Sequence, residues 1–287
     1  MSVPGFEIHQ VAKHDFAVAV DWAASEGWNP GLDDLDAFFA ADPEGFFMGF
    51  VDSTPVSAIS VVRYGNAYGF LGFYMVLPAY RGKDLGIATW RAGMAHLDGR
   101  VVGLDGVVAQ QHNYQKSGFV LAGRNIRFTG VPSCSSQTSH DSVTPIRQVD
   151  LEKVIAYDRP FFPDDRTSFV SVWAGPSEGV SRTGFMVKAG DDVRGYGVIR
   201  RCRSGYKVGP LFADTPDIAA TLFQALCSSV EPGAPVSLDV PEDNAAAVKL
   251  AESSNLSPSF ETARMYKSGM PKLPIDRTFG ITTFELG

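Results

Sequence analysis

The sequence predicts a mixed α/β fold, a sheet with helices packed on it, that occurs twice along the chain. Apolar runs rich in β-branched and aromatic residues alternate with segments of helical periodicity, which is typical of this class. The chain has 287 residues, more than one average core needs, so we expect two domains. The element order of the first half returns in the second, which indicates a degenerate internal duplication.

The first half begins with two predicted helices. Asp15–Glu26 carries an apolar stripe, and Gly27 can end it as a C-cap. Asn29-Pro30 then opens a helix that stops at Asp42-Pro43. The elements that follow are, in order, strands at Phe46–Val51, Val56–Tyr64 and Tyr68–Leu77, a helix after Gly86, a strand at Val101–Val108, a short helix at Asn113–Ser117 and a strand at Phe119–Phe128.

A small, polar segment separates the two halves. Gly130–Thr144 contains the run Pro132–Ser139, which is typical of a linker or loop. We therefore predict a domain over 1–130, a linker over 131–145 and a second domain over 146–287. The second half is predicted to contain a helix at Leu151–Tyr157, strands at Phe169–Ala174, Gly184–Ala189, Tyr196–Arg203 and Tyr206–Phe212, a helix at Ile218–Val230, a strand at Val236–Val240, a helix at Asn244–Ser253 and a strand at Phe260–Tyr266.

Composition excludes several classes of protein. A net charge of −7 argues against a nucleic-acid partner and is compatible with a cationic amine. The three cysteines are widely spaced and show no metal-ligand pattern, so we expect reduced thiols in a cytoplasmic protein without a metal. Met1–Lys13 lacks the apolar run of a secretory signal, and no segment reaches the ~20 apolar residues of a membrane helix. We expect no membrane partner and a monomer or homodimer.

The segment Gly72–Ala88 carries the clearest chemistry. A buried strand runs into a turn with Arg81, Gly82 and Lys83, and the turn runs into a helix. Free N–H groups at a helix start attract anions, glycine allows close approach of a phosphate, and the two cations add charge. The spacing matches neither a Walker loop nor a Gly-x-Gly-x-x-Gly turn. The alternative is a βα turn that is basic by chance.

At this point the sequence resembles the GNAT (GCN5-related N-acetyltransferase) superfamily, whose pyrophosphate loop reads Arg/Gln-x-x-Gly-x-Gly/Ala after a long central strand. The segment Arg81–Gly86 is in register with it, except that Asp84 stands where the family usually has its first glycine. An acidic side chain there opposes a pyrophosphate, although Asp tolerates the left-handed backbone of the turn. The resemblance implies acetyl-CoA as cosubstrate, no metal, and cofactor binding by Tyr74, Met75, Val76, Arg81, Gly82, Lys83, Asp84, Leu85, Gly86, Ile87, Ala88 and Asn113.

A second motif lies further along the chain. Asn113–Phe119 resembles the family's Asn…Tyr-x-x-x-Gly-Phe element, which implies that Tyr114 protonates the departing CoA thiolate. A phenol with a pKa of ~10 and a thiol of ~8.5 are close enough for such a transfer. The alternative is that Tyr114 and Phe119 only pack between a helix and the sheet.

The acceptor site is less defined. The segment Trp22–Gly31 places a carboxylate and two tryptophans around a tight turn, and GNAT proteins commonly line the acceptor pocket with this loop. On that basis Glu26 is a catalytic candidate that orients or deprotonates an amine, and Trp28 and Asn29 are substrate-binding candidates. Asp105, late in the strand beside the cofactor strand, is a further pocket candidate. The alternative is that the tryptophans are core anchors and Glu26 is a solvated helix end.

Segments of both halves resemble one two-lobed GNAT branch, with a YitH-like acetyltransferase domain at its C-terminus. They are Trp22–Gly31, Gly103–Val107, Val208–Asp214, Leu238–Asn244, Thr262–Tyr266 and the ending Phe279–Gly287. The second lobe has no counterpart of the basic loop, since Ala213–Asp217 contains two acidic residues and no cation. We therefore expect one cofactor site, in the first lobe, and a degenerate second lobe that closes the acceptor pocket or fixes orientation, with Asp239, Glu242 and Asn244 as its polar contributions. The alternative for Asn244 is that it caps a helix that starts after a strand. The predicted function is an N-acetyltransferase acting on a primary amine of a small molecule by direct attack. The alternatives are a CoA- or metabolite-binding protein without catalysis, transfer of another acyl group, and a protein lysine as acceptor.

Overall fold

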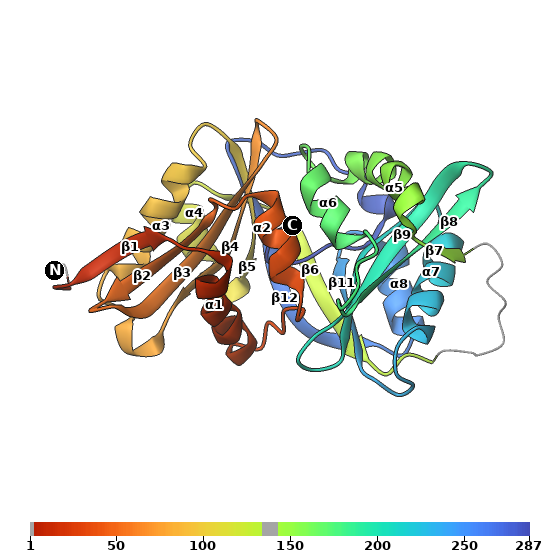
Figure 1. Cartoon of the computed structure of the whole chain (residues 1–287), viewed down its shortest axis with the longest axis horizontal. Helices are drawn as coiled ribbons and strands as arrows, with labels where there is room; N and C mark the ends of the chain where they lie inside the picture. Colours follow the sequence, from red (N-terminus) through yellow and green to blue (C-terminus); the bar gives the residue numbers. More distant parts are fainter. Residues whose placement is uncertain (1–2, 134–142) are drawn as a thin grey trace.

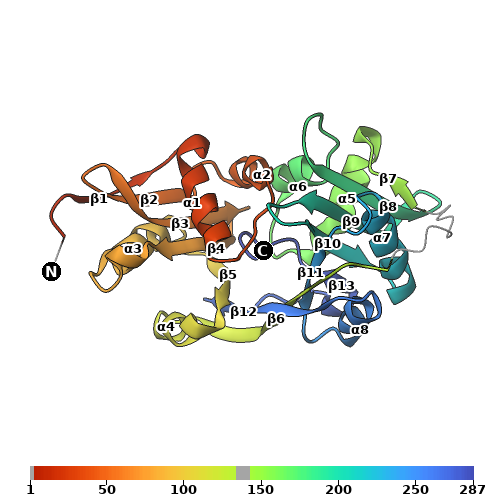
Figure 2. The ribbon, with the colours of Figure 1, turned by 90° about the horizontal axis from the view of Figure 1, so that it is seen from below.

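The computed structural model describes residues 3–133 and 143–287. Within these ranges, 13 strands form one mixed sheet in the order β1-β2-β3-β4-β5-β12-β6-β11-β10-β9-β8-β7, with β13 added against β10 (Figures 1 and 2). The strands are β1 Phe6–Gln10, β2 Phe46–Val51, β3 Thr54–Tyr64, β4 Tyr68–Val76, β5 Val101–Val107, β6 Val120–Gly130, β7 Val143–Pro145, β8 Arg182–Ala189, β9 Asp192–Arg201, β10 Tyr206–Ala213, β11 Val236–Pro241, β12 Ser257–Lys267 and β13 Thr278–Gly280. The α-helices are α1 Lys13–Ser25, α2 Asp34–Ala41, α3 Leu85–His96, α4 Gln111–Lys116, α5 Leu151–Asp158, α6 Thr167–Trp173, α7 Pro216–Ser228 and α8 Ala245–Ser253.

The two halves repeat one topology. In the first half, antiparallel β2, β3 and β4 lead through α3 to β5, which is parallel to β4. In the second half, antiparallel β8, β9 and β10 lead through α7 to β11, which is parallel to β10. Helices α4 and α8 occupy the corresponding next positions. This repetition matches the duplication that the sequence predicts.

The halves are joined through the sheet. Strand β12, from the end of the chain, lies between β5 and β6 and pairs antiparallel with both. Strand β6 in turn pairs with β11. Figure 2 shows β6 and β12 running together from one half of the molecule to the other. A strand of each half is therefore built into the sheet of the other half.

A second joint lies between helices α2 and α6. The Phe38 ring of α2 stacks on Trp173 and Phe169 of α6, with centroid distances of 6.1 and 6.5 Å. These three side chains are fully buried and belong to one apolar cluster that includes residues of both halves. The packing fixes the two halves relative to one another.

One predicted element is wrong. Phe169–Ala174 is not a strand, because it lies within helix α6 and its end. The run Phe-Val-Ser-Val-Trp has strand composition, but its buried side chains Phe169, Val170 and Trp173 form one face of a helix that packs on α2. The short strands β1, β7 and β13 were not predicted, and α2 begins at Asp34 rather than beside Pro30. Residues 134–142 of the predicted linker lie outside the described residues.

Two further observations concern membrane-spanning helices and the cysteines. Among the described helices, none is long and apolar enough to cross a membrane. Cys202 and Cys227 are buried free thiols, while Cys134 lies outside the described residues.

Candidate active site

The site begins where the parallel strands β4 and β5 separate. Their pairing runs from Tyr68↔Val101 to Leu71↔Leu104 and stops there, although β4 continues to Val76 and β5 to Val107. In the described part of the chain, no other strand pairs with β4 on this side. Beyond Leu71, the backbone N–H and C=O groups of β4 on this side therefore face no described strand. Because buried backbone groups need hydrogen-bond partners, this edge of β4 is suited to bind a ligand.

A bulge turns the backbone at this separation. The β3–β4 register shifts between Ala58↔Met75 and Ser60↔Gly72, so β4 carries one more residue than β3 over this stretch. Phe73 has a φ of 44°, a left-handed conformation that is unfavourable for a bulky side chain. Strain of this kind is found at functional sites, where the surrounding packing maintains it. The Phe73 ring is fully buried among the rings of Phe16 and Phe38.

The basic turn leads into helix α3. Gly82 and Asp84 have φ values of 74° and 63°, so Asp84 adopts the left-handed conformation that the sequence required of it. Asp84 is the N-cap residue and makes no side-chain hydrogen bond to the helix start. The Ala88 N–H donates to the Asp84 carbonyl, which leaves the N–H groups before Ala88 as the unpaired first turn of α3. A Cβ at Gly86 would crowd the Tyr74 hydroxyl and Val76, so glycine lets the helix start lie against β4.

Arg81 links the turn to the strand and to the first helix. Its Nε donates to the Val76 carbonyl at 2.9 Å, and its Nη2 donates to Glu26 Oε1 at 2.9 Å. Both charged side chains are about half-exposed. Lys83 lies with Nζ 5.2 Å from the centroid of the Tyr80 ring.

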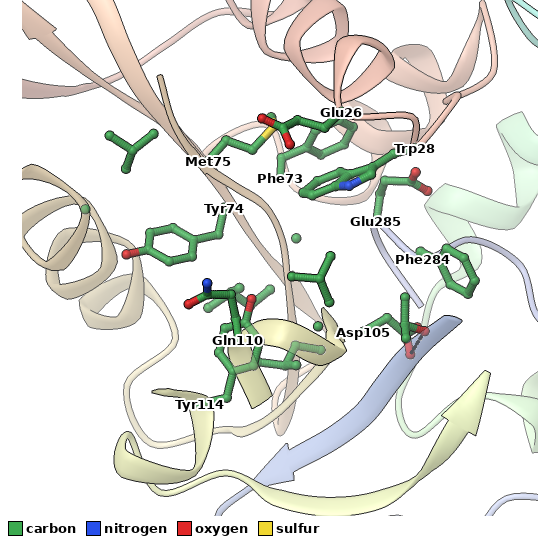
Figure 3. A pocket seen from close by; sticks show the side chains of 18 of the residues that line it. Glu26, Trp28, Phe73, Tyr74, Met75, Asp105, Gln110, Tyr114, Phe284 and Glu285 are labelled. Atoms are coloured by element: carbon green, nitrogen blue, oxygen red, sulfur yellow. Dashed lines mark hydrogen bonds between the residues drawn. The ribbon is translucent and has the colours of Figure 1, made fainter. Parts of the chain in front are cut away.

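These elements surround a cavity of about 530 Å³ (Figure 3). Figure 3 shows Tyr114 and Gln110 at one end and Trp28, Glu285 and Phe284 at the other. The lining residues come from both halves of the chain and are Glu26, Trp28, Leu71, Gly72, Phe73, Tyr74, Met75, Val76, Arg81, Gly82, Asp84, Gly86, Ile87, Leu104, Asp105, Gly106, Val107, Gln110, Tyr114, Phe260, Thr262, Phe284 and Glu285.

Tyr114, on α4, lies at the β5 side of the cavity. Its ring stacks on Trp90 with centroids 5.9 Å apart, and a Cβ at Gly106 would lie only 2.7 Å from the Tyr114 Cδ2 atom. The glycine therefore provides the space that the ring occupies. Burial raises the pKa of Tyr114 to about 12, with a smaller contribution from Tyr74. The phenol is consequently protonated at neutral pH.

Asp105 is paired within the protein. Arg264 of β12 donates to both carboxylate oxygens, at 2.9 and 2.5 Å, and Asn125 of β6 donates to Oδ1 at 2.8 Å. The Asp105 side chain is fully buried. Its carboxylate connects β5 to the two strands that join the halves, and it has little remaining capacity for a substrate.

The loop that carries Trp28 and Asn29 is attached to the second half. The Asn29 side chain donates to the Ser204 carbonyl and accepts from the Ser204 N–H. The Trp28 carbonyl accepts from Arg127 Nη1 and from Lys207 Nζ, both at 2.8 Å. Asn29 does not line the cavity, whereas Trp28 does.

The second pair of parallel strands also separates, and the protein fills this opening itself. Pairing of β10 with β11 ends at Val208↔Leu238. Strand β13 then pairs with β10 through Leu211↔Gly280 and Phe212↔Thr278, and the Ile281 N–H donates to the Asp239 carbonyl.

The chain continues from this opening as a buried C-terminal segment, 281–287, which reaches the first cavity. The Thr283 hydroxyl accepts from the N–H groups of Glu285 and Leu286, at 3.0 and 2.8 Å. The Tyr64 hydroxyl donates to the Leu286 carbonyl at 3.2 Å. Phe284 and Glu285 thereby line the cavity of the other half.

Glu285 belongs to a buried group of charges. Its side chain is 2% exposed, and its two carboxylate oxygens have no hydrogen-bond partner among the described residues. Burial lowers the pKa of Lys207, and the charges of Glu285 and Asp239 oppose this effect. Burial also acts against the charges of Arg127 and Arg200, but Asp239 and Asp34 respectively raise the pKa values of these two residues, with a smaller contribution from Glu285. Arg127 pairs with Asp239 at 2.7 Å, and Arg200 pairs with Asp34 at 3.1 Å. Three formal positive charges therefore face three formal negative charges.

Several predicted site residues come together here and others do not. Tyr74, Met75, Val76, Arg81, Gly82, Asp84, Gly86, Ile87, Tyr114, Glu26, Trp28 and Asp105 line the cavity, and Lys83, Leu85, Ala88, Asn113 and Asn29 do not. None of the three candidates from the second half lines the cavity, and Asn244 has the helix-capping role that the sequence offers as its alternative. Asp239 pairs with Arg127, Asn244 caps α8, and Glu242 is exposed. Sequence reasoning missed Gln110, Phe260, Thr262, Phe284 and Glu285. For Thr262, Phe284 and Glu285 the sequence offered only the resemblance of the segments around them to the two-lobed branch.

Comparison with known proteins identifies the family. A model described as the acetyltransferase (GNAT) family matches residues 9–119, and one described as an acetyltransferase (GNAT) domain matches residues 154–280. The holothin acyltransferase of Pseudoalteromonas sp. (strain SANK 73390) is 33% identical over 273 residues, which cover 95% of this chain and 92% of that protein. The chain belongs to the GNAT acetyltransferase family. It is a tandem GNAT protein and an acyltransferase, while its assignment to the YitH-like branch remains a prediction.

Solved structures share this tandem GNAT fold. A putative acetyltransferase from Pyrococcus horikoshii has a TM-score of 0.82 at 20% identity and covers 100% of this chain and 98% of its own. A tandem GNAT protein from the clavulanic acid biosynthesis pathway has a TM-score of 0.61 at 14% identity, with 93% and 99% covered. At these identities the likeness concerns the fold alone.

Proposed function

We propose that this GNAT protein transfers the acetyl group of acetyl-CoA to a primary amine of a small molecule in the 530 Å³ cavity. The observation that carries the proposal is that three features open on this one cavity. They are the separated edge of β4, the unpaired first turn of α3, and Tyr114. GNAT proteins in general use acetyl-CoA, which supplies an acetyl group activated as a thioester.

The residues present fit a pyrophosphate-bearing cosubstrate. The N–H groups at the start of α3 and the positive φ of Gly82 suit close approach of phosphate oxygens. Arg81 supplies a full positive charge at the same end of the cavity. We assign the backbone N–H groups of Tyr74, Met75 and Val76 to hold the cosubstrate along β4 and to stabilise charge on the reacting carbonyl oxygen.

We assign Tyr114 the role of proton donor to the departing sulfur. Its raised pKa, about 12, keeps the phenol protonated at pH 7. A free thiol has a pKa of ~8.5, so complete transfer from this phenol is uphill, and a hydrogen bond to the developing thiolate supplies much of the stabilisation. The Tyr114 ring position is fixed by Trp90 and by the space at Gly106.

Glu26 remains the predicted proton acceptor for the amine. It lines the cavity, and Arg81 holds its carboxylate at 2.9 Å. When Arg81 turns to a phosphate oxygen, the Glu26 carboxylate loses this partner and becomes available to the acceptor. We further propose one cofactor site per chain, since β13 occupies the opening in the second half that corresponds to the site in the first.

An acetyl-CoA titration by calorimetry, followed by turnover of an amine panel read as thiol release, tests the proposal. We expect binding that Arg81→Glu weakens strongly, and thiol release that depends on the amine. No binding at millimolar acetyl-CoA, or full activity in Arg81→Glu, would contradict it. Binding without thiol release for any amine would favour a non-catalytic CoA-binding protein, a candidate that Asp84 supports because its carboxylate opposes a pyrophosphate.

A further inference from the structure

Aromatic side chains from three separate elements line the end of the cavity opposite Tyr114. Trp28 follows α1, Phe260 lies on β12, and Phe284 lies in the C-terminal segment. The Phe260 and Phe284 ring centroids are 6.0 Å apart. The Trp28 indole and the Phe284 ring are drawn at this end in Figure 3. This end therefore offers large flat apolar surfaces to an acceptor.

One buried arginine holds these rings in place. The Arg127 guanidinium carbon lies 4.7 Å from the Phe284 ring centroid and 5.8 Å from that of Phe260. The same guanidinium donates to the Trp28 carbonyl and, through two nitrogens, to Asp239. Since Arg127 is buried and bidentately paired, the aromatic surfaces are preorganised before an acceptor arrives.

Two of the three carboxylates around this end are already neutralised by the protein. Asp105 is bound by Arg264, and the Glu285 oxygens are buried beside Arg127, Lys207 and Arg200. Glu26 becomes available to the acceptor only when Arg81 turns to a phosphate oxygen, and its proposed role is to take a proton. A site for a polycation, such as an aminoglycoside, would need several open carboxylates, and this end supplies one at most.

We infer that the acceptor is a planar amine whose nitrogen is attached to an aromatic or conjugated ring, and that Trp28 and Phe284 select it by stacking. The inference rests on the proposed acetyl transfer and specifies its acceptor. A ring-attached amine delocalises its lone pair into the ring and is uncharged at pH 7, unlike an alkylamine. Such a nucleophile needs no carboxylate to bind a positive charge, which agrees with the neutralised carboxylates of this end. It also places a flat ring where the aromatic side chains are.

Matched ligands test this selection without depending on turnover. Acetanilide and N-cyclohexylacetamide, the unreactive products of aniline and cyclohexylamine, differ in the flatness of one six-membered ring. We expect calorimetry to show that the wild-type protein binds acetanilide about tenfold more tightly, the effect of an aromatic contact beyond area alone. Phe284→Leu should remove most of this difference. Phe185→Leu, on β8 and outside the cavity, is the matched control and should preserve it.

Turnover supplies the second measurement. We expect wild-type thiol release with aniline, less efficient release with benzylamine and cyclohexylamine, and none above background with kanamycin. Should Phe284→Leu fail to fold, Trp28→Leu serves as the second variant, with the same loss of preference expected. Equal affinities for the two products, a preference that survives either folded variant, or efficient acetylation of kanamycin would overturn the inference. Acetylation of amines together with equal product affinities refutes only the inference, whereas no acetylation of any amine refutes the proposed function.

Discussion

Gly72→Ala tests whether the C-terminal segment shapes the acceptor site. Gly72 lies on β4 next to the last residue paired with β5, and its φ is not in the left-handed region. Glycine is therefore required here for space. A Cβ would lie 2.9 Å from the carbonyl carbon of Glu285 and 3.1 Å from its Cα, and it would overlap the Glu285 carbonyl oxygen. These are backbone atoms, so the segment itself must move, by a distance on the order of 1 Å.

The cost follows from what holds the segment. Moving it disturbs three hydrogen bonds that hold it to the rest of the protein, one from Tyr64 to the Leu286 carbonyl and two from Arg166 Nη1 to Thr282 Oγ1 and the Gly287 carbonyl. At about 1 kcal/mol each, their loss costs about 3 kcal/mol. Alanine regains about 0.5–1 kcal/mol over glycine in a strand. The free energy of unfolding should therefore fall by about 2 kcal/mol. At about 2–4 °C per kcal/mol, the value typical of large domains, the Tm should fall by about 4–8 °C.

Calorimetric melting and steady-state kinetics provide the assay. The acceptor KM should rise because Phe284 moves with the segment, while acetyl-CoA affinity should change by less than about threefold. Gly123→Ala on β6 is the control, because its Cβ would meet only the end of the Asp243 side chain, at 3.1 Å. That variant should melt at or above the wild-type temperature. A Gly72→Ala protein with wild-type Tm and acceptor KM would show that the C-terminal segment is not held against β4 as described.

Three further predictions concern single side chains. Tyr114→Phe should lower kcat on the order of a hundredfold with little change in acetyl-CoA affinity, because it removes the proton donor and keeps the ring; unchanged kcat would leave Tyr114 a packing residue. Asp84→Gly should tighten acetyl-CoA binding about fivefold, the effect of removing one carboxylate about 4 Å from a phosphate in water, and calorimetry showing weaker binding would contradict this. Glu285→Gln leaves three buried cations facing two carboxylates, so the free energy of unfolding should fall by roughly 3 kcal/mol in chemical denaturation; wild-type stability would show that the Glu285 carboxylate does not stabilise these cations.

Local signals predicted the geometry of the part of the cavity that we assign to the cosubstrate. The Arg81–Gly86 turn needs only a strand, two positive φ values and a helix start, and all three are properties of neighbouring residues. The left-handed conformation of Asp84 was expected for the same reason. Tyr114 follows the next strand by a few residues, so α4 brings it to the same cavity.

The acceptor half depends on long-range pairing and was not predictable in the same way. Nothing local in β12 indicates that it lies between β5 and β6, since both of its neighbours are more than 125 positions away. Asp105 is bound by Arg264 of β12 and by Asn125 of β6, and both contacts depend on this pairing. Because the sequence does not reveal the pairing, sequence reasoning assigned the Asp105 carboxylate to the substrate. Helix α6 was predicted as a strand because its residues are mostly β-branched and aromatic. The buried face that makes it a helix packs on α2, and this long-range contact is not visible in the local sequence.

Strand β13 and the C-terminal segment 281–287 explain how the second half contributes to the cavity of the first half without a cofactor loop of its own. Strand β13 satisfies the backbone edge that β10 exposes where it separates from β11, which a buried edge requires in the absence of a ligand. Having crossed that opening, the chain needs only the few residues from Ile281 to reach the first cavity with Phe284 and Glu285. Filling the second opening and lining the first are therefore two effects of one segment. Substitutions that loosen β13 should alter acceptor binding more than acetyl-CoA binding, although β13 does not line the cavity.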